Sequence, residues 1–378
     1  MMTNNRIYEM RLDRLRKQLH DEQIEAILIT NPLNVTYLTG FSGDSSFFLV
    51  LKYQAYIISD TRFQKQLEEE CSQFQTCIRD QNKTTWQEAG DRIRLEKLAD
   101  LAYEARTMTC AQLNILQALV PHTVLRASLG VVERLRVIKD DGEIQAIRDS
   151  VAMGQQAQRM MIADLSDEMS ELWVAGMVEL NIRKQGGRGV GFPTIVATGE
   201  RSALPHALPT TRPVGEAGFL LLDWGAQARF YTSDLTRIIL CPNFHEPKVR
   251  QRVESTLRKI YTVVLQAQKC ACAAIRPGSA ARDIDRAARS VIEDAGYGMF
   301  FRHGLGHGIG LEVHEAPDLR QTSADILRPG MVITIEPGIY LPDLGGVRIE
   351  DDILVTDDGY EVISHKVAKE WDEVTSLD

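Results

Sequence analysis

The sequence of 378 residues has few of the features that bind nucleic acid or cross a membrane. Its 43 lysines and arginines are outnumbered by 52 acidic residues, which gives a formal net charge of −9. An acidic chain lacks the basic surface that neutralises phosphates. No apolar run reaches the length of about 18 residues that a membrane-spanning helix needs, and the polar N-terminus does not resemble a signal peptide. We therefore expect no nucleic acid or membrane partner, and a cytoplasmic location.

Cysteine is scarce and shows no pairing pattern. None of the six cysteines forms a CxxC pair, and only Cys270 and Cys272 stand close together. A chain of this length can bury a sufficient core without disulfide bonds, and thiols stay reduced in the cytoplasm. We expect the cysteines to be reduced and mostly buried.

Residues 1–128 read as an α/β domain, because short apolar runs alternate with stretches of helical periodicity. A helix is expected over residues 8–19 and a buried strand over 26–29. The apolar runs 47–51 and 55–58 predict a hairpin. Residues 61–70 can form a helix with Asp60 or Thr61 as its N-cap.

Residues 129–378 read as an α+β domain, because helices and short strands follow one another in mixed order. A long helical stretch over 131–162 is interrupted near Asp140, and a second helix is expected over 170–184. The other predicted helices cover 248–271 and 281–295. The predicted strands cover 194–197, 219–223, 236–240, 332–335 and 347–354.

Four acidic residues stand inside or beside apolar strands of the second domain: Asp223, Asp234, Glu336 and Glu350. A buried carboxylate is costly unless it is paired or binds a metal. Any one of them alone reads most simply as a strand-end acid or cap, but four in one domain favour a metal site. Asp223 and Asp234 could face each other across an antiparallel pair, within reach of one cation.

Three of the eight histidines, His303, His307 and His314, lie in the glycine-rich run 303–315. His303 and His307 have the i,i+4 spacing of a zinc-binding helix, but the interleaved glycines argue against a helix and HExxH is absent. The glycines do not follow the GxGxxG spacing of a nucleotide-binding loop. They instead permit tight turns and close approach of ligands. A lone histidine is most simply a core residue, whereas three beside buried acids favour a site.

Asp, Asp, His, Glu and Glu together form a plausible ligand set for two metal ions. Carboxylates and imidazole suit Mn²⁺, Co²⁺, Fe²⁺ or Zn²⁺ better than Cu⁺ or iron–sulfur clusters. Two such ions, bridged by carboxylates, activate a shared water. The set therefore predicts hydrolysis.

Residues 130–365 resemble the pita-bread metallopeptidases: methionine aminopeptidase, aminopeptidase P, prolidase and their creatinase relatives. Five motifs occur in the expected order: LPHA at 204–207, DWG at 223–225 with SDLTR at 233–237, the run 303–317, IEPG at 335–338, and VRIED at 347–351. The first domain resembles the prolidase type through NPLNVTYLTGF at 31–41 and DTRF at 60–63. The resemblance implies an α/β creatinase/prolidase-like N-terminal domain, 1–128, and an α+β pita-bread catalytic domain, 129–378.

The resemblance also implies the metal ligands. Asp223 should hold one ion, His307 and Glu336 the other, and Asp234 and Glu350 should bridge both. Manganese is the expected ion, with Co²⁺, Zn²⁺ and Fe²⁺ as alternatives. A hydroxide between the two ions would attack the scissile carbonyl.

The same resemblance implies roles in catalysis and substrate binding. Glu336 would accept the proton of the nucleophile, and His314 and His303 would stabilise the tetrahedral oxyanion. His206 and Arg348 match positions that bind substrate in the proline-specific branch. Arg348 could equally pair with an acidic neighbour in its own strand.

The match at His206 and Arg348, together with the two-domain layout, favours the proline-specific branch, which cleaves Xaa-Pro bonds in dipeptides or at peptide N-termini. A homodimer is expected by resemblance. The dipeptidase and aminopeptidase readings both stay open. Two rivals also remain: a creatinase-like C–N hydrolase without metal, and a catalytically dead pita-bread module that binds peptides or proteins.

Overall fold

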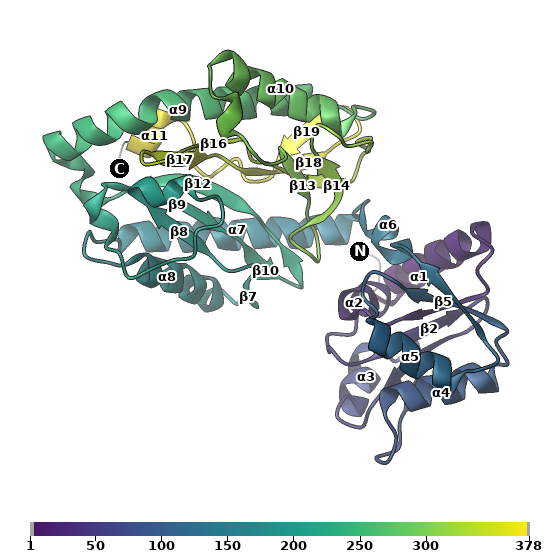
Figure 1. Cartoon of the computed structure of the whole chain (residues 1–378). Helices are drawn as coiled ribbons and strands as arrows, with labels where there is room; N and C mark the ends of the chain where they lie inside the picture. The colour runs from purple at the N-terminus through teal and green to yellow at the C-terminus, as the bar shows by residue number, and fades with distance from the viewer. Residues whose placement is uncertain (1–3, 376–378) are drawn as a thin grey trace. The chain divides into compact units, whose positions relative to one another are not determined.

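The computed structural model describes residues 4–375 and divides the chain into two compact units, Met1–Arg136 and Val137–Asp378 (Figure 1). Among the described residues, no helix combines the length and apolar character that crossing a membrane requires. All six cysteines lie in the described part and are free, and four of them are buried.

The first unit is built on one six-stranded sheet with the order β4-β3-β2-β1-β5-β6. Its strands are β1 (Ala26–Ile29), β2 (Phe47–Leu51), β3 (Ala55–Ser59), β4 (Gln75–Ile78), β5 (Asp100–Glu104) and β6 (Val124–Ser128). Its helices are α1 (Asn4–Asp21), α2 (Pro32–Thr39), α3 (Gln64–Glu70), α4 (Thr85–Leu95), α5 (Cys110–Leu119) and α6 (Val131–Arg136). Only β2 runs antiparallel to its neighbours. The expected α/β organisation, with its β2–β3 hairpin, is confirmed.

The predicted cap of the helix over 61–70 is wrong. Helix α3 begins only at Gln64, and the residue before it, Phe63, makes no side-chain capping bond. The carboxylate of Asp60 is instead held by the backbone N–H and the guanidinium of Arg62. Because this ion pair engages the acid, the residues directly after it form a turn rather than the first turn of the helix.

The second unit has strands between two layers of helices. Its α-helices are α7 (Asp141–Ala163), α8 (Glu171–Lys184), α9 (Pro247–Ala274), α10 (Ala281–Asp294) and α11 (Trp371–Thr375). Its short 3-10 helices are η1 (Gly199–Ala203), η2 (Val214–Glu216), η3 (Pro242–His245) and η4 (Gly298–Phe300). Figure 1 shows α7 and α8 along one side of the strands, and α9 and α10 along the other.

The strands of the second unit form four small sheets, with the orders β11-β10-β7, β12-β9-β8, β14-β13-β15-β18-β19 and β16-β17. The strands of the first half are β7 (Gly189–Val190), β8 (Ile195–Thr198), β9 (Phe219–Trp224), β10 (Ala226–Ala228), β11 (Tyr231–Thr232) and β12 (Leu235–Leu240). Those of the second half are β13 (Gly306–Gly308), β14 (Glu315–Leu319), β15 (Val332–Ile335), β16 (Gly338–Leu341), β17 (Gly345–Arg348), β18 (Asp351–Val355) and β19 (Tyr360–Val362).

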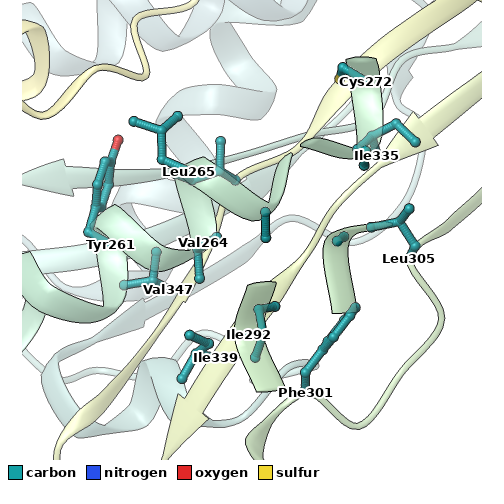
Figure 2. Packing of buried hydrophobic residues seen from close by; sticks show 14 of the residues in the cluster. Tyr261, Val264, Leu265, Cys272, Ile292, Phe301, Leu305, Ile335, Ile339 and Val347 are labelled. Carbon is teal, nitrogen blue, oxygen red and sulfur yellow. The ribbon is translucent and has the colours of Figure 1, made fainter. Parts of the chain in front are cut away.

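Strand β9 is apolar on both faces, and its alternation decides where Asp223 points. Leu220 and Leu222 belong to the core packed under α7 and α8. Phe219 and Leu221 belong to the other core. Figure 2 shows part of this core, where Val264 and Leu265 of α9 and Ile292 of α10 pack. Because side chains alternate along a strand, Asp223 lies on the face of Phe219 and Leu221. It therefore points into the interior between the two halves of the unit.

The predicted strand over 347–354 is in fact two strands in different sheets. Strand β17 pairs with β16, whereas β18 pairs with β15. Between them the N–H of Ile349 bonds to the carbonyl of Pro337, and that of Glu350 bonds to the carbonyl of Thr236. Local apolar character cannot reveal this change of partner, because both strands are fully buried. The change places Glu350 at the junction of two sheets.

We expect Gly225→Ala to destabilise the second unit. A Cβ there would lie 2.0 Å from the carbonyl oxygen of Ser233, a backbone atom of the neighbouring chain segment. Such overpacking lowers the free energy of unfolding by about 1–3 kcal/mol. The matched control is Gly176→Ala in α8, where a Cβ meets no atom within 4 Å and helix propensity raises stability by about 0.5–1 kcal/mol. Calorimetric unfolding distinguishes the two, and a Gly225→Ala protein as stable as the wild type would contradict the packing described.

Candidate metal centre

The nine residues singled out from the sequence all line one cavity of about 550 Å³ in the second unit. They are His206, Asp223, Asp234, His303, His307, His314, Glu336, Arg348 and Glu350. The four acids and the one histidine expected to hold metal come from five separate stretches of the chain: β9, the segment before β12, β13, the end of β15, and the β17–β18 junction. The fold thus gathers residues that are up to 127 positions apart, from 223 to 350.

Asp223 and Asp234 share a face but are not directly opposite each other, as the sequence analysis allowed. Strands β9 and β12 are antiparallel, with Asp223 opposite Thr236 and Trp224 opposite Leu235. Asp234 therefore lies just beyond this ladder and diagonal to Asp223. Since residues two apart in a strand project to the same face, both carboxylates still reach the cavity.

The tightest group of candidate ligands is Asp234, His307 and Glu350, whose nearest ligand atoms all lie within 4.8 Å of one another. The Nε2 atom of His307 lies 3.7 Å from Oδ2 of Asp234 and 3.4 Å from Oε1 of Glu336. Its other nitrogen, Nδ1, lies 3.0 Å from the carbonyl oxygen of Gly308. With Nδ1–H donating to that carbonyl, the lone pair of Nε2 faces the acids, as in metal-binding histidines.

Burial makes this cluster of acids electrostatically unfavourable by itself. Desolvation raises the pKa of Asp223, Asp234, Glu336 and Glu350. Repulsion between neighbouring carboxylates adds to the rise for Asp234, Glu336 and Glu350, whereas Arg348 opposes it for Asp223. The pKa of Glu350 is raised to about 8. Desolvation lowers the pKa of His307 to about 4, which leaves its imidazole neutral and able to ligate.

The residues present fit divalent cations. Among the described residues, the Oδ1 atom of Asp223 is buried without a hydrogen-bond partner. Carboxylate oxygens and a neutral imidazole are the ligands that Mn²⁺, Fe²⁺, Co²⁺ and Zn²⁺ accept. A cation in the cavity would satisfy this oxygen and offset the repulsion between the acids.

Arg348 pairs with a distant acid and not with a neighbour in its own strand. Its Nη2 atom lies 2.6 Å from Oδ2 of Asp223. Its Nε–H donates to the hydroxyl of Thr236 at 2.9 Å, and that hydroxyl donates to Oε2 of Glu350 at 2.6 Å. Arg348 thereby connects two of the acids, directly and through Thr236.

Tyr340 is a site residue that the sequence analysis missed. Its hydroxyl accepts from Nη1 of Arg348 at 2.8 Å and lies 2.9 Å from Nε2 of His303. Nδ1 of His303 lies 2.7 Å from the carbonyl of Gly304, so with Nδ1–H donating there, Nε2 accepts from the tyrosine. Burial lowers the pKa of His303 to about 3 and raises that of Tyr340 to about 12, so both are neutral.

Of the two residues that the sequence analysis missed, Thr236 could have been predicted from its position and Tyr340 could not. Thr236 lies two positions after Asp234 at the start of a strand, and this period of two could have placed it on the same face. Tyr340 sits in the apolar run Ile339 to Leu341 and reads as a core aromatic.

The two remaining histidines lie at the edge of the cavity. His314 is exposed, and its ring centre lies 4.3 Å from that of His307, at an interplanar angle of 74°. His206 lies close enough to Asp223 to lower the pKa of that carboxyl group. The geometry brings all predicted residues together, and their individual roles stay predictions.

Comparison with known proteins identifies the family. Residues 145–357 match metallopeptidase family M24, and residues 11–138 match the creatinase/prolidase N-terminal domain. The chain therefore belongs to metallopeptidase family M24, and the predicted two-part fold with a pita-bread catalytic domain is confirmed.

Individual relatives match nearly the whole chain. The uncharacterized peptidase YqhT of Bacillus subtilis is 35% identical over 94% of this chain and 98% of its own. The structure of an Xaa-Pro dipeptidase from Bacillus anthracis matches with a TM-score of 0.88 and 35% identity, over 96% of this chain and 99% of its own. A prolidase from Pyrococcus horikoshii matches with a TM-score of 0.86 and 32% identity, over 96% and 99%. An X-Pro aminopeptidase from Thermotoga maritima matches with a TM-score of 0.84 and 29% identity, over 94% and 99%.

We expect Glu350 to make the metal-free protein less stable as pH rises. The native state keeps a proton on Glu350 up to a pKa of about 8, whereas the ordinary value is 4.5. Between these values the unfolded chain binds fewer protons, so the free energy of unfolding falls with increasing pH. Denaturant unfolding at pH 5 to 8 should show this fall in the wild type relative to Glu350→Gln, which stays neutral throughout. Parallel pH profiles of the two proteins would contradict the raised pKa.

Proposed function

We propose that this metallopeptidase hydrolyses Xaa-Pro peptide bonds with two divalent metal ions in the cavity. The observation that carries the proposal is the convergence of three buried carboxylates and the partly buried Glu336 with Nε2 of His307. Further support comes from near full-length similarity to structures described as an Xaa-Pro dipeptidase, a prolidase and an X-Pro aminopeptidase.

The five proposed ligands are divided between the two metal ions as follows. Asp223 would hold one ion, His307 and Glu336 would hold the other, and Asp234 and Glu350 would contribute to both. Manganese is the proposed ion, and Co²⁺, Zn²⁺ and Fe²⁺ suit the same ligands. When bound, such ions would polarise the scissile carbonyl and lower the pKa of a water.

Glu336 is the proposed acceptor of the proton that the nucleophile loses. Its carboxylate lies within 3.4 Å of His307 and 4.0 Å of His303, at the centre of the cluster. A base in this position is within reach of a water held among the other acids.

Stabilisation of the oxyanion is assigned chiefly to His314. Its ring is exposed at the cavity wall, where an N–H could donate to the developing charge. Both ring nitrogens of His303 are engaged, by Gly304 and Tyr340. His303 can donate to substrate only after it releases Tyr340, so its first role is to orient the Tyr340–Arg348 pair.

Proline recognition must use shape, because the tertiary amide of an Xaa-Pro bond has no N–H. Phe192, Ile195 and Val313 provide an apolar wall, and His206 lies beside it. Arg348 is only 3% exposed, and its donors already serve Asp223, Thr236 and Tyr340. We therefore propose that Arg348 acts on substrate mainly by holding these groups in place.

The length of the substrate stays open, since similar structures carry both dipeptidase and aminopeptidase descriptions. The homodimer and the cytoplasmic location likewise stay predictions. The metal-free C–N hydrolase and the catalytically dead module remain the rivals. The ligand set, complete in this chain, favours the metal-dependent peptidase over both.

We expect the purified protein to cleave Ala-Pro or Ala-Pro-Ala with added Mn²⁺, Co²⁺ or Zn²⁺, and EDTA to abolish cleavage. Cleavage of Ala-Pro alone indicates a dipeptidase, and preference for the tripeptide indicates an aminopeptidase. Asp234→Ala should lose at least about 100-fold in kcat/KM, since outer partners of metal sites alone typically cost 10–100-fold.

The matched control is Asp283→Ala, which removes an exposed acid from α10. This variant should keep wild-type activity, and circular dichroism should show both variants folded. Wild-type activity in Asp234→Ala would refute the ligand assignment. Cleavage unaffected by EDTA would favour the metal-free rival, and no metal binding with no cleavage would favour the dead module.

A further inference from the structure

A second polar cluster is centred on Asp351, the residue that directly follows the proposed ligand Glu350. The Asp351 side chain is fully buried and accepts four hydrogen bonds. Nη2 of Arg237 and Oγ of Ser364 donate to its Oδ1, each at 2.7 Å. Nε2 of Gln268 and Nζ of Lys369 donate to its Oδ2, at 2.8 and 2.5 Å. None of these residues lines the cavity of the candidate metal centre.

Arg237 connects this cluster to the backbone of a proposed ligand. Its Nη1 donates to the carbonyl of Glu350 at 2.5 Å and to that of Thr236 at 2.9 Å. The N–H of Glu350 also bonds to the Thr236 carbonyl. Asp351 directly follows Glu350 in the chain. The guanidinium of Arg237 therefore holds the junction between β17 and β18 at two points: the carbonyl of Glu350 and the carboxylate of Asp351.

The C-terminal segment 364–369 is held by the same groups. Arg237 donates to the carbonyls of Ala368 and Val367, at 2.9 and 3.1 Å. The segment returns two donors, Ser364 and Lys369, to Asp351. It lies beyond residue 357, where the match to the metallopeptidase family ends. Residues outside the region that matches the metallopeptidase family therefore hold the groups that contact Glu350.

We propose that Lys369 is a positioning residue for the metal centre, which fixes Glu350 through its ion pair with Asp351. This inference rests on the proposed function, in which Glu350 is a shared ligand. Without Lys369, the buried Asp351 keeps only one cationic partner, Arg237. A buried carboxylate that loses a charged partner is strongly destabilised, and it relaxes by shifting the chain next to Glu350.

A second lysine, Lys269, provides the matched control, because it pairs with the residue directly after this segment and not with Asp351. Nζ of Lys269 in α9 lies 2.6 Å from Oε1 of Glu370, and both side chains are nearly half exposed, at 46% and 45%. Lys269→Met also removes one positive charge, together with the ion pair to Glu370, the residue that follows Lys369. It leaves every bond to Asp351 in place.

The test measures the dissociation constant of Mn²⁺ by titration calorimetry on the metal-free full-length protein. Lys369→Met should bind Mn²⁺ about tenfold more weakly, the lower end of the effect of outer partners on metal affinity. Lys369→Arg keeps a cation and donors and should restore affinity to within about twofold of the wild type on the same scale. Lys269→Met should bind as the wild type does. Ser364→Ala, which removes one neutral donor to Asp351, should lose less Mn²⁺ affinity than Lys369→Met. It replaces Lys369→Met in the test if that variant does not fold.

Thermal unfolding of each variant separates positioning from stability. Wild-type Mn²⁺ affinity in a folded Lys369→Met or Ser364→Ala protein, with only a lower Tm, would overturn the inference. Equal losses in Lys369→Met and Lys269→Met would also overturn it, because the effect would then come from loosening the segment in general. If the wild type itself binds no Mn²⁺, the proposed metal centre fails and the inference falls with it.

Discussion

Four carboxylates that lie near one another, three of them buried and Glu336 partly buried, are the constraint on which the rest of the site depends. Burial raises the pKa of each, and repulsion between the carboxylates adds to the rise for Asp234, Glu336 and Glu350. His303 and His307 beside them are neutral, and the guanidinium of Arg348 is already paired with Asp223. The cluster therefore keeps an excess of acid that only protons or bound cations can offset. This excess favours a metal site over a structural ion-pair network.

The fold meets this constraint by surrounding the acids with buried strands and with hydrogen bonds to neighbouring side chains. Strand β9 is apolar on both faces, so Asp223 projects from a strand that is itself fully buried. A hydrogen bond from Thr236 holds the carboxyl group of Glu350, and one with Tyr340 holds the ring of His303, in fixed orientations. Behind them, Asp351 and Arg237 fix the backbone. Such support explains how like charges can be held close together before any cation binds.

The acids and histidines singled out from the sequence all line one cavity. They could be recognised in the sequence because most of them are polar residues in apolar or glycine-rich runs. The sequence also predicted most helices and strands, since their periodicity is local. It could not predict the register of β9 against β12, the division of 347–354 between two sheets, or the pairing of Arg348 with Asp223. These depend on contacts between distant segments. Tyr340 was missed because an aromatic residue in an apolar strand looks the same whether it packs in a core or bonds to a histidine.

The most direct test of the account is to count the protons released when Mn²⁺ binds to the metal-free protein at pH 7. Titration calorimetry in buffers of different ionisation enthalpy gives this number, because released protons are taken up by the buffer. The account predicts net proton release, since Glu350, with a pKa of about 8, holds a proton at this pH until a cation displaces it. Binding without proton release, or no binding at all, would contradict the claim that buried acids in excess form the metal site.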